Sequence, residues 1–98
     1  MKTYVIIMKD AKLDVAVVGA TGIVGQQFVV ALDEHPWFRI KSLAASEKSA
    51  GKTYEEALRD PNTNALRWFC SEDVPDSVLS MTVGDASTLD LSEMDIVF

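Results

Sequence analysis

Residues 15–25, VAVVGATGIVG, constrain the fold more than any other stretch of this chain. The first four are consecutive apolar residues, which is typical of a parallel strand buried on both faces. Gly19, Gly22 and Gly25 follow at three-residue spacing, and glycine lets the backbone turn sharply and approach a neighbour without a Cβ in between. Beyond this turn the apolar spacing becomes helical. The sequence therefore predicts a strand that enters a helix through a glycine turn.

A strand, a glycine turn and a helix in this order bring unpaired backbone N–H groups and the positive end of the helix dipole to one point. Such a point binds a diphosphate, so the sequence predicts a dinucleotide site. The spacing G-x-x-G-x-x-G, rather than G-x-G-x-x-G, indicates a variant of the Rossmann fold. Thr21 fits two interpretations: its hydroxyl caps the helix, or its hydroxyl or N–H meets a phosphate oxygen. A turn without any ligand is the alternative.

The composition favours one small domain. The chain has 98 residues, of which 48% are hydrophobic, and a formal net charge of -6. This negative charge argues against a nucleic-acid partner, and no apolar run is long enough to span a membrane. The apolar run at the start is too short for a signal peptide, and a single cysteine, Cys70, forms no intrachain disulfide. We therefore expect a soluble, cytoplasmic α/β protein.

The helix after the glycine turn is predicted to run from residue 22 to about His35, because the following proline disfavours helical geometry there. Its apolar residues are expected to share a buried face: Val24, Phe28, Ala31 and Leu32. Its polar residues are expected to face water: Gln26, Gln27, Asp33 and Glu34. We expect His35 to interact with the helix dipole in the last turn rather than to act in catalysis.

A second strand is predicted at residues 38–45, and the resulting βαβ unit places its end beside the glycine turn. Residues 46–52 form a polar loop, and 53–59 form a short helix or cover that loop. The remaining expected elements are a turn at 60–64, short strands at 67–70 and 81–83, and a last strand at 95–98.

Residues 1–12 are predicted to be an N-terminal extension, with an added edge strand at 4–8 as the alternative. Residues 13–98 are predicted to form a Rossmann-type α/β domain, in which helices flank a parallel sheet. Domains seldom end inside a buried strand, as 95–98 would, so we expect an incomplete N-terminal portion of a longer domain. An unpaired sheet edge would make that portion self-associate or leave it marginally stable.

The loop at residues 46–52, SEKSAGK, predicts which dinucleotide binds. NAD-binding domains usually present Asp or Glu to the adenosine ribose at the end of the second strand, but this chain has Ala45 or Ser46 there. Ser46 and Ser49 are small hydrogen-bond donors, and Lys48 and Lys52 are nearby cations. A 2′-phosphate carries roughly two negative charges near neutral pH, which these groups suit. We therefore expect NADP rather than NAD.

Glu47 lies in the same loop and would repel a phosphate. We therefore expect its side chain to turn outward when the cofactor binds. The alternative is that the whole segment is an ordinary solvated loop without a ligand.

Four segments, in the same order, resemble the aspartate-β-semialdehyde dehydrogenase family, and its archaeal and fungal branch most. They are VVGATGIVGQQFV at 17–29, EHPWF at 34–38, LAASEKSAGK at 43–52 and DIVF at 95–98. The resemblance implies NADP bound through the glycine turn and the serine loop, and a homo-oligomeric full-length parent. With the loop residues argued above, the predicted cofactor contacts are Gly19, Thr21, Gly22, Ile23, Val24, Gly25, Ser46, Lys48 and Ser49.

The resemblance also implies a reaction: NADPH reduces aspartyl phosphate to aspartate semialdehyde with release of phosphate, on the route to lysine, threonine and methionine. In the family a cysteine thiolate of an Asn-x-x-Cys motif attacks the acyl group, and a later histidine handles protons. This chain contains neither motif, so we predict no catalytic residue, no metal ligand and no turnover by the chain alone. Cys70 is expected to be a small, semi-buried hydrophobic residue.

Two alternatives stay open at this point, and a third lacks its catalytic pair in this chain. Malonyl-CoA reductases belong to the same branch and differ in the acyl substrate. Short-chain dehydrogenases also use a GATG-type turn, but they need a Tyr-x-x-x-Lys pair, and here Tyr54 is followed four residues later by Leu58. A stand-alone dinucleotide-sensing domain would equally lack catalytic residues.

Overall fold

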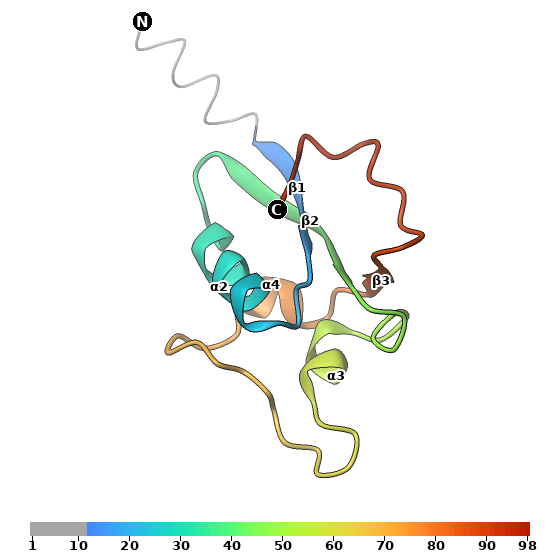
Figure 1. Cartoon of the computed structure of the whole chain (residues 1–98). Coiled ribbons are helices and arrows are strands. Elements are labelled where there is room, and N and C mark those ends of the chain that lie inside the picture. The colour runs from blue at the N-terminus through green and yellow to red at the C-terminus, as the bar shows by residue number, and fades with distance from the viewer. Residues whose placement is uncertain (1–11) are drawn as a thin grey trace, which may run out of the picture.

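The computed structural model describes residues 12–98. The predicted extension at 1–12, apart from Lys12, and its alternative strand at 4–8 lie outside this part. The elements follow one another as β1 (Leu13–Val18), α2 (Ile23–Leu32), β2 (Phe38–Ala45), α3 (Tyr54–Leu58), α4 (Asp76–Leu79), β3 (Val83–Asp85) and β4 (Ile96–Val97) (Figure 1). β1, α2 and β2 form one βαβ unit, the short helices α3 and α4 connect β2 to β3, and no helix is described between β3 and β4.

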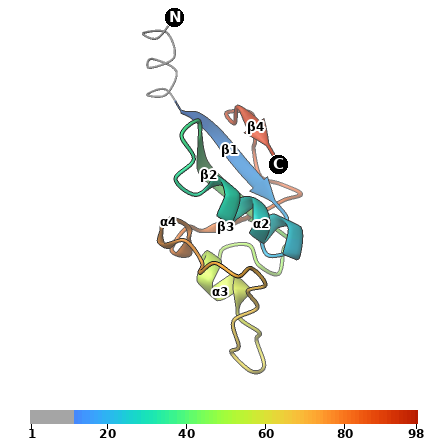
Figure 2. The same cartoon turned by 90° about the vertical axis from the view of Figure 1, so that its left-hand side faces the viewer.

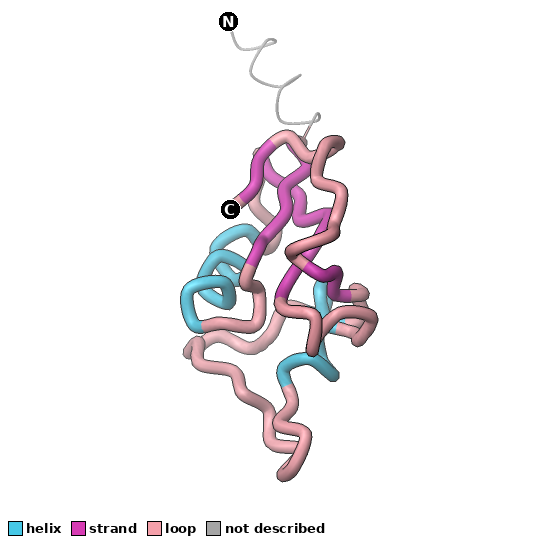
Figure 3. The backbone as a smooth tube through the Cα atoms, turned by 45° about the vertical axis from the view of Figure 1, so that its right-hand side comes forward, coloured by secondary structure: helices cyan, strands magenta, loops and turns pink. Residues whose placement is uncertain are grey.

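The four strands form one sheet in the order β3-β2-β1-β4, and every neighbouring pair is parallel. Figure 3 shows the strands in magenta. β1 is an inner strand, which explains why Val15, Ala16 and Val17 are completely buried. The prediction of a strand buried on both faces is confirmed for these three residues. The predicted fold class, a Rossmann-type parallel sheet with flanking helices, is confirmed as well.

One face of the sheet carries the core. Because strand side chains alternate between faces, Val15 and Val17 of β1 point to the same side. That side packs against α2, α3 and α4, which Figure 2 shows beside the sheet. The core residues supplied by the helices are Val29, Leu32, Tyr54, Ala57, Leu58 and Val78. The opposite face carries small residues, among them Ala16, Ala44 and Gly84.

The helical face of α2 differs from the prediction. Gly25, Gln26, Val29 and Leu32 are buried, whereas Val24, Phe28 and Ala31 are exposed. Only Leu32 of the expected buried face lies in the core, and the expectation that Gln26 faces water is wrong. Gly25 packs closely on the glycine turn, as described below. This contact rotates the helix so that the side with Gly25 and Gln26 faces the core.

The end of α2 also differs. The helix ends at Leu32, Asp33 is extended, and Glu34 has a positive φ of 54°, so His35 lies beyond the last turn. The predicted interaction of His35 with the helix dipole is therefore wrong. Instead, its Nδ1 accepts the N–H of Trp37 at 3.1 Å, and its ring lies 4.7 Å from that of Phe38.

The segment at 67–70 is a loop, so the predicted strand there is wrong. The N–H of Arg67 donates to the carbonyl of Leu58 at 2.8 Å. The carbonyl of Arg67 and the N–H of Phe69 pair with the side-chain amide of Gln26, at 2.9 and 2.8 Å. Because these backbone groups already have partners, the segment needs no neighbouring strand.

Three further predictions are confirmed or adjusted. The short helix expected at 53–59 is α3, which begins at a capping box in which Thr53 and Glu56 each accept the other's N–H. The turn at 60–64 is present, with the carboxylate of Asp60 accepting two backbone N–H groups. The strand expected at 81–83 begins only at Val83, and the four-residue helix α4 was not predicted.

Candidate cofactor site

The glycine turn is tied directly to the end of β2. Gly19 has a φ of +75°, which a residue with a Cβ rarely adopts. In this conformation the N–H groups of Gly19 and Ala20 both donate to the carbonyl of Ala44, at 2.8 and 3.0 Å. The predicted neighbourhood of the turn and the end of the second strand is confirmed. The serine loop, which begins at Ser46, therefore lies next to the turn.

The other two glycines have different roles. A Cβ on Gly25 would lie 2.0 Å from the carbonyl oxygen of Gly19, so only glycine lets α2 pack this closely on the turn. A Cβ on Gly22 would lie 3.5 Å from the same oxygen, which is an ordinary contact. Gly25 is therefore required for packing, while Gly22 leaves the surface of the turn open.

The first turn of α2 presents unpaired donors. Its N-cap is Gly22, with no side-chain cap, so the interpretation of Thr21 as the cap is wrong. Within residues 12–98, the N–H groups of Thr21, Ile23, Val24 and Gly25 donate to no other group. Unpaired N–H groups at a helix N-terminus, together with the helix dipole, are the chemistry that binds a phosphate.

A hydrogen bond from Tyr54 of α3 helps to hold the main chain of the glycine turn in place. The hydroxyl of Tyr54 donates to the carbonyl of Ala20 at 2.6 Å, and the tyrosine side chain is fully buried. Burial raises the pKa of Tyr54 well above its ordinary value, so the hydroxyl keeps its proton and remains a donor. The main chain of the turn is thus fixed on both sides, by β2 and by α3.

A pocket of about 520 Å³ lies over the carboxyl ends of β1, β2 and β3, where ligands bind in folds of this kind. Gly19 and Gly22 form part of its wall, and Ser46, Glu47 and Asp85 line it too. Hydrogen bonds from the hydroxyl and N–H of the nearby Ser87 lower the pKa of Asp85, so this carboxylate is charged at neutral pH.

A second pocket, of about 360 Å³, lies on the other side of the serine loop. It is lined by Ser46, Lys48 and Ser49 of the loop, and by Thr21 and Arg67. Thr21 and Ser46 line both pockets, so the two are adjacent. We call the first the acidic pocket and the second the basic pocket, after the charged residues in their walls.

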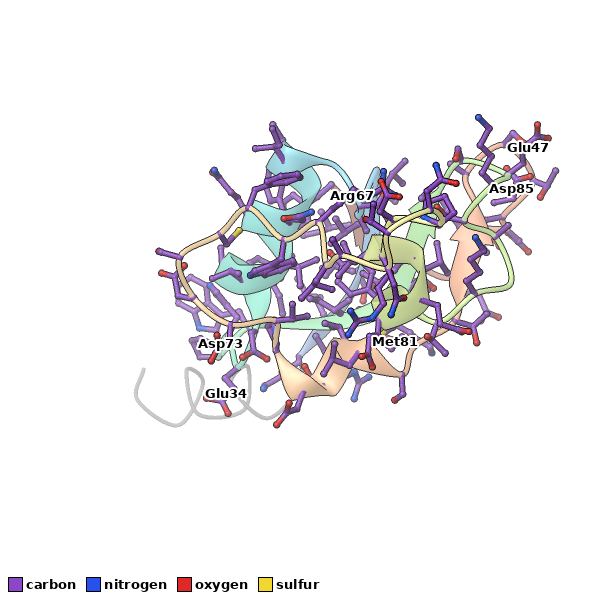
Figure 4. All side chains as sticks on the ribbon, turned by 90° about the horizontal axis from the view of Figure 1, so that it is seen from below. Glu34, Glu47, Arg67, Asp73, Met81 and Asp85 are labelled. Carbon is purple, nitrogen blue, oxygen red and sulfur yellow. The ribbon has the colours of Figure 1, made fainter. Side chains whose placement is uncertain are left out.

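Glu47 lines the acidic pocket but not the basic pocket, and Lys48 lines the basic pocket but not the acidic one. Figure 4 shows Glu47 and Asp85 at one side of the molecule, with Arg67 away from both. The loop thus places the carboxylate of Glu47 and the ammonium group of Lys48 in different pockets. A phosphate in the basic pocket would meet cations and hydroxyls rather than Glu47.

The nine predicted site residues all lie around the glycine turn. Gly19, Thr21, Gly22 and Ser46 line the acidic pocket, and Lys48 and Ser49 line the basic pocket. The remaining three line a pocket of about 490 Å³ between α2 and the end of the sheet, which also includes Phe28 and Phe98: Ile23, Val24 and Gly25.

The sequence analysis did not assign three residues to the surroundings of the turn: Gln26, Tyr54 and Arg67. Gln26 precedes Val29 by three residues, a spacing that places both on one helical face, and this was the available signal. Tyr54, Ala57 and Leu58 show the same kind of spacing on α3. Nothing in the sequence near Arg67 indicates that its loop returns to the turn.

Cys70 has no feature of a nucleophile. It is partly buried, and burial, followed by the charge of Glu72, raises the pKa of its thiol.

Within residues 12–98 no cluster of His, Cys, Asp and Glu is arranged to hold a metal ion. None of the helices described is long and apolar enough to cross a membrane.

The profile of the family described as "Semialdehyde dehydrogenase, NAD binding domain" matches residues 14–98. The chain belongs to the semialdehyde dehydrogenase family. Its glycine turn and serine loop are therefore parts of a dinucleotide-binding domain of that family.

Known relatives agree with this membership. The semialdehyde dehydrogenase domain described here is 40% identical over 86 residues to the aspartate-semialdehyde dehydrogenase of Methanothermobacter thermautotrophicus, and 43% identical over 89 residues to that of Archaeoglobus fulgidus. The alignments cover 88% and 89% of this chain but only 22% and 23% of those relatives. The chain thus spans about a fifth of their length.

A solved structure has the same fold. The crystal structure of aspartate semialdehyde dehydrogenase with NADP from Candida albicans superposes with a TM-score of 0.74 at 35% sequence identity. The match covers 89% of this chain and 22% of that one. The expected resemblance to the archaeal and fungal aspartate-semialdehyde dehydrogenases is confirmed.

Proposed function

We propose that this chain binds NADP(H) and forms the cofactor-binding part of an aspartate-semialdehyde dehydrogenase. The observation that carries the proposal is the unpaired first turn of α2 beside the basic pocket. The turn suits the diphosphate, and the adjoining pocket, with Ser46, Lys48 and Ser49, suits a 2′-phosphate. The matched relatives and the NADP-bound Candida albicans enzyme support this assignment.

Each residue of the site has a defined task in this proposal. The N–H groups of Thr21, Ile23 and Val24 donate to diphosphate oxygens, because no other group occupies them in residues 12–98. Gly19 and Gly22 leave space for the cofactor to approach the backbone. Ser46 and Ser49 donate hydroxyl hydrogen bonds to the 2′-phosphate, and Lys48 neutralises part of its charge. When bound, the cofactor supplies the hydride of the reaction.

The parent reaction that we propose is the NADPH-dependent reduction of aspartyl phosphate to aspartate semialdehyde, in a cytoplasmic homo-oligomer. The relatives named above favour this substrate over malonyl-CoA, because both are aspartate-semialdehyde dehydrogenases. This chain holds the cofactor and contains no Asn-x-x-Cys motif. It should therefore produce no NADPH from aspartate semialdehyde, phosphate and NADP, as followed by NADPH absorbance.

Calorimetric titration of the 98-residue chain with NADP and NAD tests the cofactor assignment. We expect NADP to bind more tightly than NAD and to raise the melting temperature as its concentration rises. Ser46→Asp places a carboxylate in both pockets and should reverse the preference towards NAD. Ser92→Asp adds the same charge at an exposed position away from both pockets and should leave it unchanged. Equal dissociation constants for the two cofactors in the unmodified chain would refute the proposal.

A further inference from the structure

Arg67 brings a positive charge to the basic pocket from a part of the chain outside the glycine turn and the serine loop. It belongs to the long connection between α3 and α4, which is yellow to orange in Figure 1. Arg67 is an exposed residue and lines the pocket with Thr21, Ser46, Lys48 and Ser49. Within residues 12–98 no carboxylate lies within salt-bridge distance of its guanidinium group. Backbone hydrogen bonds, with a further contribution from the nearby charge of Arg67, lower the pKa of Asp60.

The backbone of Arg67 is held in place on both sides. Its N–H donates to the carbonyl of Leu58 at 2.8 Å, which ties it to the end of α3. Its carbonyl accepts a hydrogen bond from Gln26 Nε2 at 2.9 Å, and Gln26 Oε1 accepts the N–H of Phe69 at 2.8 Å. The connection therefore lies at a defined position against α2, although it forms neither helix nor strand there.

The same amide group reaches the glycine turn. Gln26 Nε2 also donates to the carbonyl of Thr21 at 3.0 Å, and the side chain of Gln26 is completely buried. One side chain thus sets the position of Arg67 relative to the turn. A cation whose backbone is already ordered loses less conformational entropy on binding a ligand than one on a free loop.

The charges of the two pockets decide which of them takes the dianionic group. The acidic pocket has Glu47 and Asp85 in its wall, and both would repel a 2′-phosphate. The basic pocket has Lys48 and Arg67 with two serine hydroxyls. A planar guanidinium donates two parallel hydrogen bonds to phosphate oxygens, which an ammonium group cannot do.

We propose that Arg67 is a specificity-determining residue that binds the 2′-phosphate of the cofactor opposite the serine loop. This inference rests on the proposed function, because it assumes that NADP occupies the site. Gln26 is a positioning residue, which acts through the backbone of Arg67 and not on the cofactor phosphate.

The test compares Arg67→Ala with Lys12→Ala in calorimetric titrations of the full chain with NADP and NAD. Lys12 is exposed, lines neither pocket and makes no ion pair within residues 12–98, so its substitution controls for the loss of one positive charge. We expect Arg67→Ala to raise the dissociation constant for NADP about tenfold or more, the usual effect of one charge-assisted hydrogen-bonded contact. The dissociation constant for NAD should change less than about twofold, because NAD lacks the group that Arg67 binds.

Two results would overturn the role of Arg67 while leaving the proposed function intact: NADP binding unaffected by Arg67→Ala, or NADP and NAD weakened by the same factor. The second result would mean that Arg67 acts on the shared part of the cofactor or on the fold. If the unmodified chain binds neither cofactor, the proposed function and the role of Arg67 both fail. Urea unfolding of the variant should match that of the unmodified chain, because Arg67 is exposed.

Discussion

The hydroxyl of Tyr54 donates a buried hydrogen bond of 2.6 Å to the carbonyl of Ala20, and this bond joins α3 to the glycine turn. The two residues lie 34 positions apart in the chain. Ala20 is completely buried, so its carbonyl has no access to solvent if the hydroxyl is removed. The glycine turn thus depends on a helix that lies outside the βαβ unit in which the turn is found.

Tyr54→Phe should therefore lower the free energy of unfolding by about 1–3 kcal/mol, the usual cost of leaving a buried polar group unpaired. NADP should also bind more weakly, because the turn loses one of its supports. Urea unfolding and calorimetry measure the two effects. Ser77→Ala is the matched control, because it removes an exposed hydrogen bond to Asp33 and should change stability by less than about 0.5 kcal/mol. Equal stability of Tyr54→Phe and the unmodified chain would contradict the support role of this bond.

The glycines of the turn should separate into a packing role and a binding role. Gly25→Ala places a Cβ 2.0 Å from the carbonyl oxygen of Gly19, so we expect a loss of several kcal/mol, or no folding. Gly22→Ala meets only an ordinary contact and should retain the fold. Gly22→Ala should still weaken NADP binding. Its methyl group would lie in the wall of the acidic pocket and of the pocket between α2 and the end of the sheet. Circular dichroism and calorimetry distinguish the two variants, and a stable Gly25→Ala would contradict the packing role.

Gln26→Met should loosen the connection between α3 and α4. Methionine matches the volume of glutamine but leaves the carbonyls of Thr21 and Arg67 and the N–H of Phe69 without their partner. We expect a loss of about 2 kcal/mol or more in unfolding free energy and faster proteolytic cleavage of this connection. Gln27→Met changes the neighbouring exposed residue and should have neither effect. Identical cleavage rates for both variants would show that Gln26 does not hold the segment.

Acid should destabilise the fold through its carboxylates. Hydrogen bonding and charge from Arg39, at 2.6 Å, hold the pKa of Asp14 below its usual range. As the pH falls, the carboxyl of Asp14 is therefore protonated in the unfolded chain before it is protonated in the folded chain. The stabilisation from the Asp14 carboxylate is present above the pKa of the unfolded chain and is lost below about pH 4. Asp14→Asn should flatten the fall of the urea midpoint between about pH 6 and pH 3. Asp73 makes no hydrogen bond or ion pair within residues 12–98. Asp73→Asn should therefore leave the fall of the urea midpoint with pH unchanged.

Cys70 should react slowly with thiol reagents. Burial raises the pKa of its thiol, so less of the reactive thiolate is present at neutral pH than for a free cysteine. Alkylation by iodoacetamide should accelerate when the chain is unfolded in urea, and Cys70→Ser should leave NADP binding unchanged. A rate in the folded chain equal to that in urea would show that the thiol is not protected.

Local sequence was sufficient to predict the central βαβ unit. The apolar run at Val15–Val17 can be buried on both faces only inside a sheet, and the glycines that follow permit one tight entry into a helix. The unit therefore follows from the order of residues within about 30 positions, together with the chirality of such connections. The serine loop at Ser46 and Ser49 then lies next to the turn for the same reason.

Tertiary contacts decided what a local pattern cannot contain. The rotation of α2 depends on the approach of Gly25 to Gly19, and it buries Gln26, which as a polar residue was expected to face water. The segment at 67–70 has the composition of a strand, but Gln26 satisfies its backbone and holds it as a loop. The order of residues along the chain is enough to predict the glycine turn, the parallel strands and the serine loop. Only the tertiary structure brought Tyr54 and Arg67 to that turn, because their partners lie more than thirty residues away in the chain.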